Sequence, residues 1–106
     1  MRLLALALLL SPAALAWADD PTFEITIKDH KFAPSEVSVP SGTKIKLVVK
    51  NEDATAEEFE SKKLGREKVI AGKSQATIFV GPLKPGEYKF VGEYNEKTAN
   101  GKIIVK

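Results

Sequence analysis

The chain has 106 residues, with 16 Lys and Arg against 14 Asp and Glu, one histidine and no cysteine. The lack of cysteine excludes disulfides, zinc-thiolate sites, iron–sulfur clusters and blue-copper centres, whose defining ligand is a cysteine sulfur. Charges of both signs are interleaved along the chain, which argues against nucleic acid or a membrane surface as the partner, because either calls for a clustered basic patch.

The N-terminus has the pattern of a secretory signal peptide. Arg2 is followed by an apolar run from Leu3 to Leu10 and by small residues that end in an A-x-A cleavage pattern at Ala18. A transmembrane anchor is the alternative, but it needs about 18 or more continuous apolar residues. Ser11 and Pro12 interrupt this run, so a signal peptide is the better interpretation.

We therefore expect a signal peptide over residues 1–18, with Ala16 as an alternative cleavage residue, and one domain over residues 19–106. Removing the signal also removes Arg2, so that 15 cations and 14 anions remain and the net charge is +1. The protein is predicted to be exported, and periplasmic in a two-membrane bacterium. No later stretch of the sequence is apolar enough to insert directly into a membrane after cleavage.

Alternation of apolar and polar residues with period two runs through most of residues 19–106 and indicates half-buried strands. In the first such stretch, Ile25 and Ile27 share one face and Thr26 and Lys28 share the other. In chain order the pattern is found in FEITIKD, SEVSVP, TKIKLVVKN, EEFESKK, REKVIA, SQATIFV, GEYKFVGEY and GKIIVK. Turn residues separate these segments, and together they predict an all-β antiparallel sandwich or barrel of about seven or eight strands.

Tyr88 lies at the start of one predicted strand, directly after Pro85-Gly86-Glu87. Sandwich proteins often place a tyrosine at such a position, with its hydroxyl bonded back to the preceding corner. The alternative is a core aromatic without that bond. In both cases Tyr88 is structural.

Three stretches carry a resemblance to a known family: FAPSEVSVPSGTKIKLVVKN (32–51), PGEYKFVGEYN (85–95) and the terminal GKIIVK. They resemble the cupredoxin family, and the likeness covers nearly all of residues 22–106. With EEFES and REKVIAGKS also present, the chain looks most like the cupredoxin-like domain of EfeO-type periplasmic iron-uptake proteins. The resemblance implies a cupredoxin-like Greek-key β-sandwich and a role in iron uptake.

The resemblance also implies where type 1 copper ligands would fall. Such cupredoxins take one His from the loop after the VVKN strand, and a Cys, a second His and often a Met from the last loop. On this chain those positions are Glu57 or Glu58, Gly92, Asn95 and a residue near Ala99. None of them is a matching ligand, so type 1 copper and simple electron transfer are excluded.

The stretch EEFES is the most informative part of the predicted site. If Phe59 points into the core, Glu58 and Glu60 share an outward face about 7 Å apart, and Glu67 on the next strand can face them. Carboxylates with one imidazole suit Fe²⁺, Fe³⁺, Mn²⁺ or Cu²⁺ better than Cu⁺, which prefers sulfur. The resemblance implies that the loops carrying metal ligands meet at one end of the sandwich. The candidate metal ligands are therefore Glu58, Glu60, Glu67, His30 and Glu93.

These assignments have ordinary alternatives. Glu58 and Glu60 are equally typical of a charged surface, with ion-pair partners nearby in sequence at Lys62, Lys63, Arg66 and Lys68. The alternative for His30 is a solvated side chain, which is the more common role of a lone histidine in a loop. Gly92 is expected to make room for a neighbouring ring, from Phe32 or Tyr94.

These sequence features lead to three hypotheses for the function. The leading hypothesis is an exported cupredoxin-like accessory protein of iron uptake, which binds iron, or transiently copper, and passes it to a membrane iron permease or another periplasmic uptake component. The second is a metal-free interaction module of the same complex. The third is a copper-dependent ferrous oxidase, so the sequence leaves enzymatic activity open, although no catalytic residues stand out.

Overall fold

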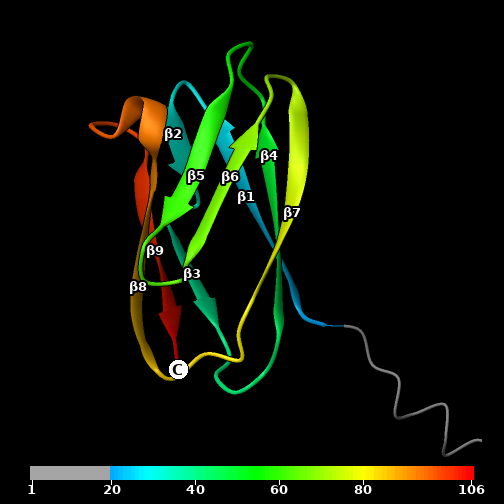
Figure 1. The fold of residues 1–106 in the computed structure, drawn as a ribbon, viewed down its shortest axis with the longest axis vertical. Coiled ribbons are helices and arrows are strands. Elements are labelled where there is room, and N and C mark those ends of the chain that lie inside the picture. Colours follow the sequence, from blue (N-terminus) through cyan, green and yellow to red (C-terminus); the bar gives the residue numbers. More distant parts are fainter. Residues whose placement is uncertain (1–19) are drawn as a thin grey trace, which may run out of the picture.

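A computed structural model describes residues 20–106, which form nine strands and one 3-10 turn (Figure 1). The predicted signal peptide, residues 1–18, lies outside the described residues. Within the described part, no helix is long and apolar enough to cross a bilayer. The elements are β1 (Thr22–Lys28), β2 (Lys31–Ala33), β3 (Glu36–Val39), β4 (Ile45–Asn51), β5 (Glu57–Ser61), β6 (Arg66–Ile70), β7 (Ser74–Val80), β8 (Gly86–Gly92), η2 (Glu93–Asn95) and β9 (Asn100–Val105).

The strands form two sheets that pack face to face. One sheet has four strands in the order β2-β1-β4-β7, and the other has five in the order β3-β9-β8-β5-β6. This confirms the predicted all-β sandwich. The strand number is higher than the predicted seven or eight because of β2, a three-residue strand that folds back on β1 with Phe32 opposite Ile27.

Two strand pairs are parallel: β1 with β4, where Thr22 lies opposite Lys46, and β3 with β9, where Glu36 lies opposite Lys102. The prediction of an antiparallel sandwich is therefore wrong for these two pairs. Apolar alternation determines which face of a sheet a residue occupies. It carries no information on the direction of the neighbouring strand.

The core lies between the sheets and is built from the inward residues of the alternating strands. Ile25, Ile27 and Leu47 have no exposed surface. At the end of the sandwich near η2, three phenylalanine rings meet: Phe32 packs edge-on to Phe90 at 4.9 Å between centroids, and Phe59 stacks on Phe90 at 5.0 Å. Such ring pairs are stabilising beyond their buried area.

Tyr88 confirms the predicted corner. Its hydroxyl donates a 2.7 Å hydrogen bond to the carbonyl of Lys84, which precedes the strand. Lys63 lies over the ring, with its Nζ 4.5 Å from the centroid. Tyr88 thus fixes the entry to β8, at the opposite end of that strand from η2.

Candidate metal centre

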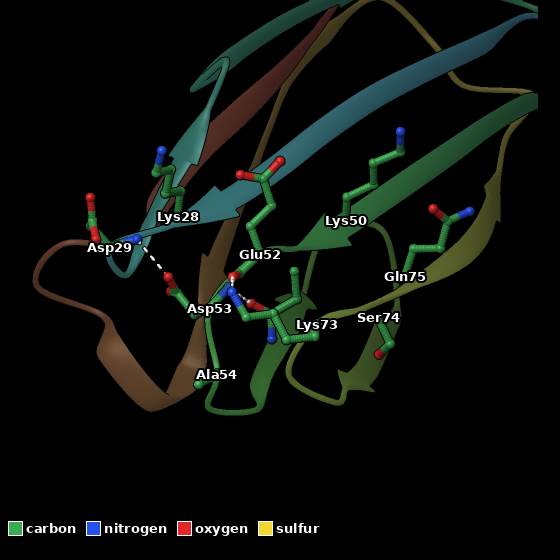
Figure 2. A pocket seen from close by; sticks show the side chains of 10 residues that line it. Lys28, Asp29, Lys50, Glu52, Asp53, Ala54, Lys73, Ser74 and Gln75 are labelled. Atoms are coloured by element: carbon green, nitrogen blue, oxygen red, sulfur yellow. Dashed lines mark hydrogen bonds between the residues drawn. The ribbon is translucent and has the colours of Figure 1, made fainter.

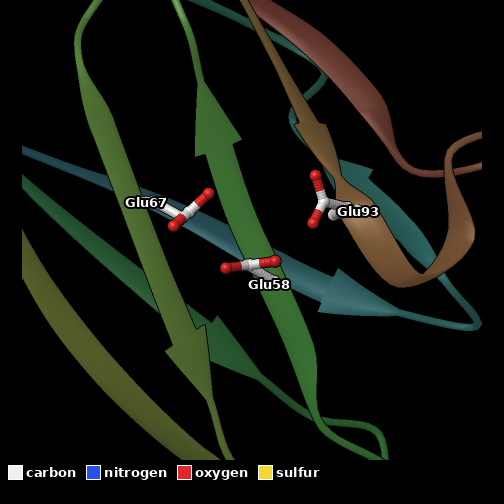
Figure 3. Close-up of side chains that lie close together, drawn as sticks. All are labelled: Glu58, Glu67 and Glu93. Atoms are coloured by element: carbon white, nitrogen blue, oxygen red, sulfur yellow. The ribbon is translucent and has the colours of Figure 1, made fainter.

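The buried ring of Phe59 sets the direction of its neighbours on β5. Because Phe59 points inward, Glu58 and Glu60 point to the outer face of the five-stranded sheet. Glu67 on β6 lies directly opposite Glu60 in the strand register. Glu93 begins η2, one residue beyond the last pair between β5 and β8. Three neighbouring elements therefore carry glutamates to one face, as Figure 3 shows for three of them.

Three of these carboxylates come within reach of a single ion. One oxygen each from Glu58, Glu67 and Glu93 lies within 4.8 Å of the other two. Glu58 is half-buried, and Glu67 and Glu93 are exposed. Hard cations bind carboxylate oxygens at about 2.0–2.6 Å, so modest side-chain rotations bring all three oxygens onto one ion.

Glu60 is the fourth member of this group, which we call the acidic cluster (Glu58, Glu60, Glu67 and Glu93). The hydrogen bond that Glu60 shares with Glu93 raises the pKa of Glu60, and partial burial and the charge of Glu93 raise it further. For Glu93, the hydrogen bond with Glu60 lowers the pKa. The hydrogen bond with Glu58, some loss of hydration, and the charges of Glu58 and Glu67 outweigh that effect, so the pKa of Glu93 is also raised. The cluster thus resists full ionisation, and a bound cation relieves this repulsion.

The acidic cluster has no cationic partner among residues 20–106: none of the ion pairs found there within 4.0 Å includes one of its carboxylates. Two of the four basic residues nearby are engaged elsewhere, while the charge of Lys62 lowers the pKa of Glu60. Arg66 donates to the carbonyl of Phe79, and Lys63 donates to the carbonyl of Glu87. No direct ion pair within 4.0 Å therefore neutralises the acidic cluster among the described residues.

His30 is not a member of the acidic cluster. It lies in the turn between β1 and β2, in the four-stranded sheet, where Asp29 and His30 both have positive φ. Oδ1 of Asp53 accepts the Asp29 N–H at 2.8 Å, and Oδ2 accepts the His30 N–H at 3.0 Å with Nδ1 of His30 3.6 Å away. The bond from the His30 N–H holds the pKa of Asp53 below its usual value, against the opposing effect of burial. His30 is thus placed beside Asp53 and apart from the predicted glutamate ligands.

A hollow of about 760 Å³ lies beside this turn (Figure 2). Its lining includes Lys28, Lys50 and Lys73. Two of these are already engaged, since Lys50 forms a 3.0 Å ion pair with Glu24 and Lys73 donates to the carbonyl of Glu52 at 2.7 Å. The hollow therefore does not present three lysines to a common anion.

Glu57 is a buried carboxylate that was absent from the predicted ligands. It is 1% exposed, because it lies two residues before Phe59 and shares its inward face. Its Oε1 accepts the N–H groups of Glu58 and Tyr94, both at 2.9 Å, and its Oε2 accepts the side-chain amide of Asn95 at 2.7 Å. The alternation in EEFES was the signal that could have identified it.

Gly92 makes room for this carboxylate. A Cβ on Gly92 would lie 2.7 Å from Cδ of Glu57 and 2.7 Å from Cβ of Ala99, closer than real contacts allow. The prediction that a ring of Phe32 or Tyr94 fills this space is wrong, because the space is taken by a carboxylate. Tyr94 instead points outward and is 54% exposed.

The positions to which the resemblance assigns type 1 ligands are neighbours in the structure: Glu57, Gly92, Asn95 and Ala99. They do not fit a type 1 copper ion. The chain has no cysteine, both oxygens of Glu57 already accept hydrogen bonds, and the Asn95 amide is turned toward Glu57. This interior is a hydrogen-bonded carboxylate site, so the acidic cluster on the outer face is the candidate metal centre.

The sequence matches the family model of the cupredoxin-like domain over residues 1–105. The chain therefore belongs to the cupredoxin-like domain family. A curated relative, the uncharacterized protein RP394 of Rickettsia prowazekii (strain Madrid E), is 51% identical over 82 residues. The match covers 77% of this chain and 66% of the relative, so the chain spans about two thirds of that protein's length.

Solved structures show the same fold at low sequence identity. The metal-binding domain of the Cu(I)-exporting P-type ATPase CopA of Streptococcus pneumoniae D39 has a TM-score of 0.68 and 15% identity, covering 80% of this chain and 84% of that one. Auracyanin A, a blue copper protein of Chloroflexus aurantiacus, has a TM-score of 0.68 and 16% identity, covering 83% and 100%. Amicyanin of Paracoccus versutus has a TM-score of 0.63 and 19% identity, covering 89% and 88%. At these identities the likeness is one of fold.

Proposed function

We propose that this chain is an exported, cupredoxin-like accessory protein of iron uptake that binds iron, or transiently copper, at the acidic cluster and passes it to a membrane permease system. The observation that carries the proposal is the convergence of carboxylate oxygens from Glu58, Glu67 and Glu93 within 4.8 Å of one another. Carboxylate oxygens favour hard or borderline cations such as iron over Cu⁺. The likeness of EEFES and REKVIAGKS to EfeO-type proteins supports iron as the cargo.

The openness of the cluster supports delivery in preference to storage. Glu67 and Glu93 are exposed, and the three carboxylates lie together across β5, β6 and η2 (Figure 3). An ion held there by three or four carboxylates keeps coordination positions for water or for the ligands of a partner. A partner can therefore take the ion by ligand exchange without unfolding the donor.

The proposal is tested by calorimetric titration of the protein with Fe²⁺ under argon, and in parallel with Cu²⁺. The variant Glu58→Gln/Glu67→Gln/Glu93→Gln is expected to bind Fe²⁺ about a hundredfold more weakly, equivalent to about 2.7 kcal/mol. The matched control is Glu24→Gln/Glu36→Gln/Glu87→Gln, which removes the same charge from glutamates that have lysine partners. The control should bind Fe²⁺ like the native protein.

Equally weak, millimolar binding by all three proteins would reject the metal-binding function. Thermal unfolding then separates the remaining hypotheses, because a ligand bound only by the folded state raises the midpoint with its concentration. A midpoint that no metal changes favours the interaction module. Oxygen consumption with Fe²⁺ that requires stoichiometric copper favours the ferrous oxidase.

A further inference from the structure

The side chain of Glu57 lies on the inner side of β5, beneath the acidic cluster, and accepts hydrogen bonds from β5 and from η2. One oxygen, Oε1, accepts the N–H of Glu58 on β5 and the N–H of Tyr94 in η2, each at 2.9 Å. Glu58 is itself a cluster residue, and Tyr94 follows the cluster residue Glu93 in sequence. A single buried oxygen thus joins the backbone segments that carry two of the three converging carboxylates.

The backbone ladder does not provide this link. The register between β5 and β8 ends at the pair of Phe59 and Gly92. The N–H of Gly92 donates to the carbonyl of Ala99, on the side of β8 that faces β9, and so makes no bond to β5. Beyond that pair, the hydrogen bonds that connect β5 with η2 are those accepted by the side chain of Glu57.

The second oxygen of Glu57 fixes the other end of the turn. Oε2 accepts the side-chain amide of Asn95 at 2.7 Å, and the carbonyl of Asn95 in turn accepts the N–H groups of Thr98 and Ala99. The carboxylate is 1% exposed, so water does not compete for these bonds. Bonds to an ionised acceptor are shorter and stronger than neutral ones.

We propose that Glu57 is the positioning residue of the acidic cluster: its buried carboxylate fixes the spacing between the backbones of Glu58 and Glu93. The metal-binding part of this inference rests on the proposed function, and the structural part does not. Metal ligands need distances correct to within a few tenths of an ångström. A turn that drifts by about 1 Å therefore loses the site even though every ligand is still present.

The test compares three variants. Glu57→Leu has a similar volume and removes both acceptors, whereas Glu57→Gln keeps an oxygen for the two backbone N–H groups. Ser61→Ala is the matched control, because Ser61 is also buried on β5 and its hydroxyl donates to the carbonyl of Lys89 on β8 at 2.7 Å. It removes a buried bond between the same two strands at a distance from η2.

The first readout is amide hydrogen exchange of the metal-free proteins by NMR, with Ile103 as the internal reference for global unfolding. Glu57→Leu is expected to speed exchange at Tyr94 by at least about tenfold, because a bond to a charged acceptor is worth that factor or more. Glu57→Gln and Ser61→Ala should leave it within about threefold of native. Unchanged exchange at Tyr94 in Glu57→Leu overturns the proposal. If Glu57→Leu does not fold, Asn95→Ala serves in its place, with faster exchange at Tyr94 expected and native exchange overturning the proposal.

The second readout is Fe²⁺ affinity under argon. Glu57→Leu should bind at least about tenfold more weakly than native with all four cluster glutamates in place, and Glu57→Gln should recover most of this loss. If native and Glu57→Leu bind Fe²⁺ equally, positioning is wrong and the proposed function stands. If the native protein does not bind Fe²⁺, the proposed function is wrong, and exchange at Tyr94 alone decides whether Glu57 fixes the turn.

Discussion

The side-chain amide of Asn95 donates a 2.7 Å hydrogen bond to Oε2 of Glu57, which lies 38 residues earlier in the chain. This bond connects the turn after β8 to the start of β5 through the interior of the domain. Asn95 is the position to which the cupredoxin resemblance assigns an imidazole. In this chain Asn95 instead donates one of the hydrogen bonds that satisfy the buried carboxylate of Glu57.

Asn95→Ala should therefore reduce the free energy of unfolding by about 1.5–3 kcal/mol, the range for a lost bond to a charged acceptor. The measurement is urea unfolding at pH 7. Asn100→Ala is the control, because the Asn100 amide also donates a hydrogen bond, to the carbonyl of Glu96, but at an exposed position. A loss in Asn95→Ala no larger than in the control would contradict the assigned role.

Gly92→Ala should destabilise the domain by about 1–3 kcal/mol, as overpacking of a filled interior does. The added methyl group would meet the carboxylate of Glu57 and the Cβ of Ala99, both at 2.7 Å. The double variant Gly92→Ala/Ala99→Gly removes the second contact and should recover part of the loss. Thermal unfolding of the three proteins checks both expectations, and a neutral Gly92→Ala would show that the space is not filled.

Neutralising the acidic cluster should stabilise the metal-free protein in a pH-dependent way. Repulsion and shared hydrogen bonding raise the pKa values of Glu60 and Glu93 above 4.5. A carboxyl group whose pKa is higher in the folded than in the unfolded protein stabilises the folded state at pH values below its unfolded-state pKa. This stabilisation is lost as the pH rises through the pKa of the group in the folded state.

Glu60→Gln/Glu93→Gln should thus have a higher thermal midpoint than the native protein at pH 7. At pH 3 the two midpoints should be equal, because Glu60 and Glu93 of the native protein are then protonated and neutral, like glutamine. Glu24→Gln, at an exposed glutamate that pairs with Lys50, provides the control. A midpoint difference that stays constant from pH 3 to pH 7 would contradict the electrostatic explanation.

Asp53 should have the opposite pH dependence. The N–H of His30 lowers its pKa below 3.8, so its contribution to stability is present above the unfolded pKa and is lost as pH falls through the folded value. Asp53→Asn should cost about 1–2 kcal/mol at pH 7, since one oxygen no longer accepts an N–H.

The cost of Asp53→Asn should shrink as pH falls below 3.8, which urea unfolding at pH 7, 4 and 3 would detect. Glu52→Gln, at the neighbouring exposed carboxylate, should change little at any of these pH values. An effect of Asp53→Asn that does not vary with pH would point to a steric cause.

Period-two patterning was sufficient to predict the strands and much of the candidate site. It placed Phe59 inside and Glu58 and Glu60 outside, and the register then set Glu67 opposite Glu60. The tyrosine corner at Tyr88 was also predictable, because it depends on local spacing alone.

Other features depend on contacts that are distant in sequence and were not predictable in this way. The parallel pairing of β3 with β9 is a property of the chain's path between sheets. The separation of His30 from the glutamates follows from a turn that Asp53 holds by hydrogen bonds to two positive-φ residues. The role of Gly92 depends on the carboxylate of Glu57, which fills the space beside it and comes from a strand distant in sequence.

The order of the five-stranded sheet constrains when the acidic cluster can be assembled. Residues 100–105 form β9, an interior strand that joins β3 to β8. Until those residues are available, β8, β5 and β6 lack their connection to the remainder of that sheet. The strand formed last in the described chain is thus the one that completes the sheet carrying the acidic cluster.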